Sequence, residues 1–256
     1  MVFAISAILL HITGLFQVFF AYIGTTAFAL GIIAYIFIKL YDDTRIVPKL
    51  VIYGLYFISA TMFLGFFSNL GIYPKLIYIL FTTVLSYLFL ISINVFFVSE
   101  KKGEKIPLIE AAHVIVSISI VIIVFLGSTN IYKLPIFLDL PLVNLVSKTV
   151  LFAVFYFVLL KNFKWFFLMN RAGEITDELI AKVQGLISIE MIFLTEISLV
   201  LCFFPFEDFG RGAFIAVTTY IANNFIQNHL NHKLNNKFLL ESITVFIVIY
   251  LFIYLL

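Results

Sequence analysis

Long apolar stretches alternate with short polar segments along the whole sequence. Each stretch has about 20 residues, the length of helix that crosses a hydrocarbon core about 30 Å thick. The first stretch ends at Leu40. The other seven cover residues 50–70, 75–98, 107–126, 142–160, 179–204, 212–228 and 238–256. The pattern predicts an all-α polytopic membrane bundle of about eight transmembrane helices, with residues 1–256 as one domain and no soluble domain.

The first stretch is longer than one membrane crossing requires. Residues 1–40 contain no charged side chain except Lys39, and as one helix they would measure about 60 Å. We expect the helix either to break near Gly24 or to lie partly along the membrane interface, and the structure of residues 1–22 stays open. A cleavable signal peptide is not expected, because no basic segment follows Met1.

Composition supports a membrane protein and excludes several other classes. Hydrophobic residues make up 63% of the chain, charged residues 12%, and the mean hydropathy is +1.15, whereas soluble proteins are typically about 25% charged. The net charge of +2 gives no reason to expect a nucleic-acid partner. Cys202 is the single cysteine, which excludes an intrachain disulfide and a CxxC metal site.

The basic residues are distributed unevenly between alternate loops. The first, third, fifth and seventh loops hold twelve of the sixteen Lys and Arg residues, and the even-numbered loops hold Lys75, Lys133 and Arg211. The remaining one, Lys148, lies within a stretch. By the positive-inside rule, the odd-numbered loops are cytoplasmic and both termini lie outside. We expect a multi-pass protein of the plasma (inner) membrane.

Ionisable side chains within the apolar stretches are the first candidates for function, because burying them in hydrocarbon is costly. Glu110 and His113 are three residues apart and share a helix face. Such a Glu-x-x-His pair can bind a metal, as in di-iron bundles. The alternative is that both side chains lie near the cytoplasmic interface and bind each other or water.

Residues 179–204 form the most polar of the predicted helices. Met191 and Cys202 lie on one stripe with several Ser, Thr and Gln side chains, while Glu190 and Glu196 project to either side of it. A helix that is polar on all sides is expected to be central in the bundle. Thioether and thiol ligands favour Cu(I), although the stripe is also typical of ordinary helix packing.

Three further groups have more than one interpretation. Lys148 is expected to pair with Glu196 at a similar depth, as a structural ion pair or as part of a gate. His229 and His232 form an i, i+3 pair that binds a metal or else belongs to a solvated Asn-rich loop. His11 lies alone on the outer side, so a bis-His haem b is possible only between His113 and His229.

The second half of the chain contains a sparse pattern of specific residues. Gly127 directly follows one apolar stretch, Lys148 lies in the first half of the next, Asn170 and Arg171 follow that one, and Glu190 lies in the first half of the stretch after them. Over residues 106–204 this order and spacing resembles the membrane domain of the copper-resistance D (CopD) family.

The first half of the chain matches that family less closely. His11 corresponds to the early histidine of the family, but the Trp and paired Gly expected downstream are absent, and Phe19 and Phe20 lie near that place.

The resemblance implies copper transport or copper handling across the plasma membrane. Its metal ligands would come from His113, Glu110, Glu190, Met191, Cys202, His11, His229 and His232. The implied partners are a periplasmic metal-binding protein or other membrane subunits. No P-loop, HExxH or GxGD element is present, so an enzyme is not expected. A b-type cytochrome subunit with haem and a non-catalytic subunit of a larger complex remain alternatives.

Overall fold

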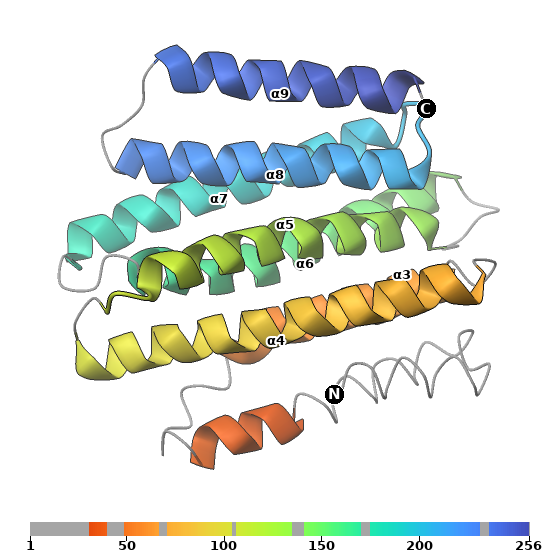
Figure 1. Cartoon of the computed structure of the whole chain (residues 1–256). Helices are drawn as coiled ribbons and strands as arrows, with labels where there is room; N and C mark the ends of the chain where they lie inside the picture. The colour runs from red at the N-terminus through yellow and green to blue at the C-terminus, as the bar shows by residue number, and fades with distance from the viewer. Residues whose placement is uncertain are drawn as a thin grey trace.

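The protein is a bundle of long helices that run side by side (Figure 1). The computed structural model describes residues 31–39, 49–66, 71–103, 106–134, 141–169, 175–230 and 236–255. A helical segment covers residues 31–39. The labelled helices are α3 (Val51–Phe66), α4 (Ile72–Lys102), α5 (Ile109–Lys133), α6 (Pro141–Met169), α7 (Asp177–Leu201), α8 (Asp208–Leu230) and α9 (Asn236–Leu255). The described residues include no β-strand, which confirms the all-α prediction for this part of the chain.

The length and composition of the described helices are those of a membrane protein, but fewer than eight of them are long and apolar enough to cross a bilayer. Four described helices, α4 to α7, are long and apolar enough to cross a membrane, and α3 is apolar but shorter. Asn223, Asn224 and Gln227 make α8 more polar than its neighbours. The break predicted near Gly24 lies outside the described residues.

Several helices extend beyond the predicted apolar limits. α5 continues to Lys133 rather than 126, and α6 continues to Met169 rather than 160. Hydropathy detects only the part of a helix that lies in hydrocarbon, whereas backbone hydrogen bonding continues into the interface. Thr176 caps the N-terminus of α7: its hydroxyl accepts a hydrogen bond of 3.2 Å from the backbone N–H of Leu179.

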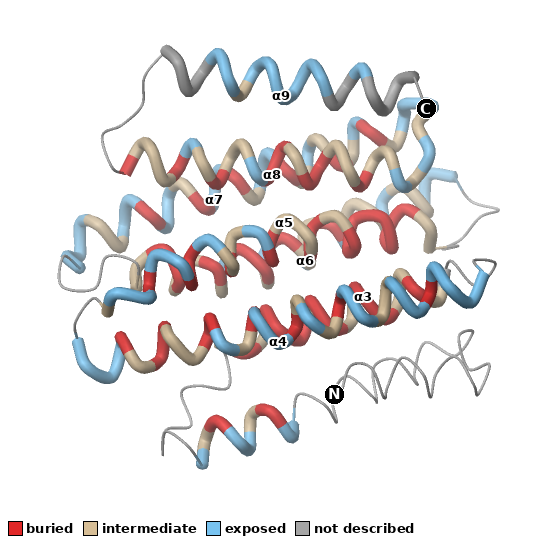
Figure 2. The backbone as a smooth tube through the Cα atoms, in the orientation of Figure 1, coloured by how far each residue is buried: buried red, intermediate tan, exposed pale blue. Residues whose placement is uncertain are grey.

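The central helix is α5, which packs against α3, α4, α6 and α8 (Figures 1 and 2). The prediction that the helix over 179–204 would be central is therefore wrong. α7 packs on α6 and α8 and leaves Glu196 and Ser188 exposed. Polar residues on several sides of a helix do not identify the centre when one of those sides forms the surface of the bundle.

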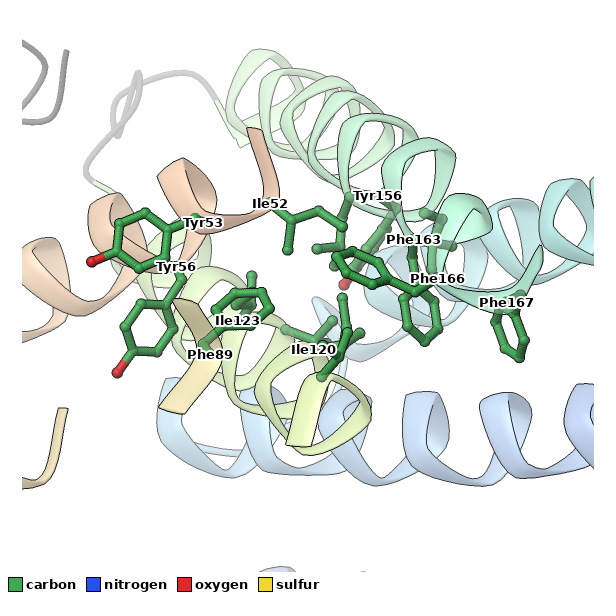
Figure 3. Close-up of a cluster of buried hydrophobic side chains, with 14 of the residues drawn as sticks. Ile52, Tyr53, Tyr56, Phe89, Ile120, Ile123, Tyr156, Phe163, Phe166 and Phe167 are labelled. Atoms are coloured by element: carbon green, nitrogen blue, oxygen red, sulfur yellow. The ribbon is translucent and has the colours of Figure 1, made fainter. Parts of the chain in front are cut away.

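Aromatic and branched side chains from α3 to α6 fill the core. Figure 3 shows Ile52 of α3, Phe89 of α4, Ile120 of α5 and Phe163 of α6 in one cluster, and all four are completely buried. In a lipid environment apolar burial alone does not hold helices together. The close packing of these side chains provides dispersion contacts that lipid chains match less well.

Tyrosine hydroxyls cross-link neighbouring helices within this core. Tyr56 of α3 donates to the carbonyl of Thr82 in α4 at 2.7 Å, and Tyr78 of α4 donates to the carbonyl of Ala60 in α3 at 2.9 Å. The Asn130 amide of α5 donates to the carbonyl of Ser59 in α3 at 2.8 Å. These bonds show that α3 and α4 run antiparallel and that α5 is attached to α3 through a polar contact.

Two glycines allow other helices to approach α5 closely. A Cβ atom at Gly127 would overlap the ring of Phe155 in α6, and one at Gly212 in α8 would overlap the hydroxyl of Thr129. The contact of Gly212 with Thr129 at one end, and of Gln227 with His113 at the other, makes α5 and α8 antiparallel. Both glycines are therefore required for packing, while neither has a positive φ.

Candidate functional site

Glu190 lies at the edge of a pocket between α7, α8 and α9. Its side chain is only 4% exposed, and neither carboxylate oxygen has a hydrogen-bond partner among the described residues. The pocket has a volume of about 530 Å³. An ionisable group without a partner in such a place is the strongest candidate for function in the described part of the chain.

The pocket is lined mainly by apolar side chains. Apart from Glu190, the polar lining residues are Thr218 and Ser242. The Thr218 hydroxyl donates to the carbonyl of Phe214 at 2.9 Å, so its hydrogen is already engaged. The described lining contains no Lys, Arg or His side chain. None of the described side chains that line the pocket can therefore neutralise the Glu190 carboxylate.

The pocket opens on the outer surface of the bundle. Phe193 of α7, Phe225 of α8 and Phe246 of α9 line it and are 47%, 40% and 37% exposed. α9 packs on α8 at the edge of the bundle (Figure 1). If these helices span the bilayer, the outer surface here faces lipid chains.

Glu190 lies close to the middle of α7. It follows Asp177 by 13 residues and precedes Leu201 by 11, which corresponds to about 20 Å and about 17 Å of helix. If α7 is centred in a bilayer core about 30 Å thick, that position is near the midplane.

Glu110 and His113 both belong to α5, but their side chains lie in different environments. Glu110 is exposed in the first turn, and His113 is buried between the rings of Phe96 and Phe167. The amide nitrogen of Gln227 in α8 lies 3.3 Å from Nδ1 of His113. The imidazole therefore has a neutral amide as its neighbour and packs between α4, α6 and α8.

His113 and His229 do not face each other. Gln227, which contacts His113, is two residues from His229, and this spacing places the two side chains on opposite sides of α8. The His229 ring stacks on the exposed Phe225 with 6.2 Å between centroids. These two residues do not fit a bis-His haem b site.

The other predicted ligands are also dispersed. Met191 packs against the hydrophobic core, and Cys202 donates to the carbonyl of Ser198 at 3.4 Å, 12 residues beyond Glu190. His11 and His232 lie outside the described residues. Within the described ranges, no three His, Cys, Asp or Glu side chains are grouped closely enough to hold a metal ion.

Lys148 has a different partner from the one predicted. Its ammonium group donates to the backbone carbonyl of Tyr132 in α5 at 2.7 Å. Glu196 is exposed on the outer surface of α7. The predicted ion pair between Lys148 and Glu196 is not formed, because Lys148 points toward α5 while Glu196 points away from the bundle.

A buried hydroxyl network joins α5, α6 and α7 toward the ends that hold Lys133 and Cys202. The Tyr156 hydroxyl lies 3.0 Å from the Ser128 hydroxyl and 2.9 Å from that of Ser198. Tyr132 donates to the carbonyl of Ser198 at 2.7 Å. The sequence indicated a polar stripe along residues 179–204, but no signal in it identified the two tyrosines that connect this helix to α5 and α6.

Comparisons with known proteins assign no family to the chain. No protein-family model, no curated protein and no solved structure matches it.

Proposed function

We propose that this chain is a CopD-like transport protein of the plasma membrane that carries a cation across the bilayer and binds it at Glu190. The proposed topology keeps about eight spans, cytoplasmic odd-numbered loops and both termini outside. A cation is the cargo because Glu190 is the only charged side chain among the described residues that line the pocket.

The observation that carries this proposal is the absence of any described partner for the buried Glu190 carboxyl. A buried acid without a hydrogen bond destabilises a fold by about 1–3 kcal/mol or more. A Leu at this position would avoid that cost. A binding role that is fulfilled only when cargo is present accounts for a glutamate that the rest of the bundle leaves unsatisfied.

The position of Glu190 along α7 also supports a role in binding the cargo. Many transporters bind their substrate near the bilayer midplane, where small rearrangements of helices open the site to one side or the other. Glu190 is close to the middle of α7, and α8 and α9 form the other walls of its pocket. Relative movement of the peripheral helix α9 against α8 would change access to the carboxyl.

Copper is the cargo that the CopD resemblance implies. Sulfur ligands favour Cu(I), and Cys202 lies 12 residues beyond Glu190 along the chain. Met191 adjoins Glu190 in sequence but packs toward the core. We therefore treat cation transport as the proposed function and copper as the first inorganic cargo to test.

Transport is tested with the full chain reconstituted in liposomes. Copper uptake is measured for the wild type, for Glu190→Gln and for the matched control Glu196→Gln, which changes an exposed glutamate of the same helix. We expect uptake that Glu190→Gln reduces at least about tenfold and Glu196→Gln leaves unchanged. Equal loss in both variants, with normal folding, contradicts a specific role for Glu190.

A second candidate function is supported by Glu196 itself. This carboxylate is exposed in the outer half of α7, where lipid would solvate it poorly. A partner membrane subunit would cover it, as expected for a non-catalytic subunit of a larger complex. Co-purification of another membrane protein at fixed stoichiometry, lost in Glu196→Leu, is the measurement that favours this function.

A further inference from the structure

The lining of the Glu190 pocket restricts the chemistry of its cargo. A metal ion needs several donor atoms around it. The pocket offers one carboxylate and the hydroxyls of Thr218 and Ser242, and the remaining walls are aliphatic or aromatic. Such walls match a ligand whose own surface is mostly apolar, with a single charge to be neutralised.

Aromatic side chains come from each helix that lines the pocket. Phe193, Phe225 and Phe246 belong to α7, α8 and α9. Ring faces attract organic cations, and this attraction is strongest where water is excluded. A carboxylate together with three phenylalanines is a combination that favours a positively charged organic group over a neutral or negative one.

The size and position of the pocket agree with this chemistry. A volume of about 530 Å³ lies within the range of about 300–1,000 Å³ typical of small-molecule sites. Ile189, Phe193 and Ile247 line it and remain 65%, 47% and 51% exposed on the outer surface. A ligand that dissolves in the bilayer can reach the carboxyl from the side, without crossing an aqueous channel.

From these observations we infer that the Glu190 pocket binds a lipophilic organic monocation, such as an amine or a quaternary ammonium or phosphonium compound, which enters from the bilayer. This inference rests on the proposed function and specifies its substrate class. The positive centre lies against the Glu190 carboxylate, and the apolar body fills the space between α8 and α9. No covalent step is involved.

The test uses two ions of nearly the same shape and opposite charge. The full chain in lipid nanodiscs is dialysed against tetraphenylphosphonium or tetraphenylborate, and empty nanodiscs of the same lipid give the partitioning background. We expect saturable binding of tetraphenylphosphonium, about one per chain, and none of tetraphenylborate. Saturable binding of both ions with similar affinity overturns the inference, because the pocket would then be an unselective groove for apolar molecules.

Variants connect the binding to this pocket. Glu190→Gln is expected to weaken tetraphenylphosphonium binding at least about tenfold, and Glu196→Gln is the matched control with unchanged binding. Ala222→Phe fills the pocket without altering a charge and is expected to abolish binding as well. Binding that survives both Glu190→Gln and Ala222→Phe places the cation elsewhere and overturns the inference.

The same preparations separate the two proposals. Copper uptake that depends on Glu190, in a protein that does not bind tetraphenylphosphonium, overturns the organic-cation class and supports transport. Tetraphenylphosphonium binding that depends on Glu190, in liposomes that show no transport of that ion or of copper, supports the pocket chemistry and overturns transport. Absence of both activities overturns both proposals.

Discussion

At the scale of single residues, three ionisable side chains of α6 and α7 meet the membrane in three different ways. Lys148 reaches a backbone carbonyl of the preceding helix, α5. Glu196 lies on the surface of the bundle. Glu190 is enclosed and has no described hydrogen-bond partner. Lys148 is satisfied by that carbonyl, and Glu196 is the residue proposed to contact a partner subunit. Of the three, only Glu190 requires a functional explanation within the chain itself.

The sequence identified these residues but not their partners. Intramembrane charge is visible in a sequence, because Lys and Glu are rare in apolar stretches. Depth along a helix can be counted at 1.5 Å per residue. The ion pair of Lys148 with Glu196 was predicted because their estimated depths are similar. The rotation of each helix about its axis cannot be counted in this way, and that rotation directs Lys148 to Tyr132.

A double-mutant cycle checks this correction. Lys148→Met removes the hydrogen bond to the Tyr132 carbonyl and should lower the free energy of unfolding by about 1.5–3 kcal/mol, the range for bonds to charged groups. Glu196→Gln should change it by less than about 0.5 kcal/mol. Because the two side chains do not touch, the coupling energy from detergent unfolding should be within about 0.5 kcal/mol of zero. A coupling above about 1 kcal/mol would restore the ion pair.

At the scale of helices, hydropathy predicted the elements but not their arrangement. The predicted stretches from residue 50 onward each correspond to a helix. Their interior faces were harder to recognise, since a membrane helix is apolar on the lipid side as well as on the packed side. The central position of α5 follows from close contacts at Gly127 and Thr129 and from Tyr–Ser bonds, which only the three-dimensional arrangement reveals.

The close approach of α8 to α5 leads to a prediction with a control within the same chain. Gly212→Ala places a methyl group against Thr129, whereas Gly185→Ala places one in open space on α7. Overpacking of a close contact typically costs about 1–3 kcal/mol, while Ala in an exposed helix is favourable relative to Gly. We expect a lower unfolding midpoint in detergent for Gly212→Ala and an equal or higher one for Gly185→Ala. Equal destabilisation by both would contradict the close packing of α5 and α8.

At the scale of the whole molecule, the candidate site illustrates what a sequence can and cannot provide. Glu190 was singled out from the chain, but Thr218, Ala222 and Ser242 were not associated with it. They come from α8 and α9, 28 to 52 residues later, and no periodicity within one helix connects them. The predicted metal ligands that the structure describes lie apart from one another, because each was chosen from the pattern of its own helix.

The proposed orientation is tested by labelling opposite ends of the bundle. In a Cys202→Ser background, Lys102→Cys lies at the end of α4 and Glu207→Cys lies just before α8. The distribution of Lys and Arg predicts that a membrane-impermeant maleimide added to intact cells labels Glu207→Cys only. Labelling of Lys102→Cys before permeabilisation, with Glu207→Cys protected, would reverse the topology.

The lateral opening of the pocket between α7, α8 and α9 determines how affinity should be expressed. A ligand that arrives through the hydrocarbon is present there at its membrane concentration, which for a lipophilic ion differs greatly from its concentration in the buffer. An apparent dissociation constant in aqueous units would therefore increase with the amount of lipid in the sample. Occupancy would instead follow the mole fraction of ligand in the bilayer, so that the membrane itself acts as the reservoir from which this protein draws.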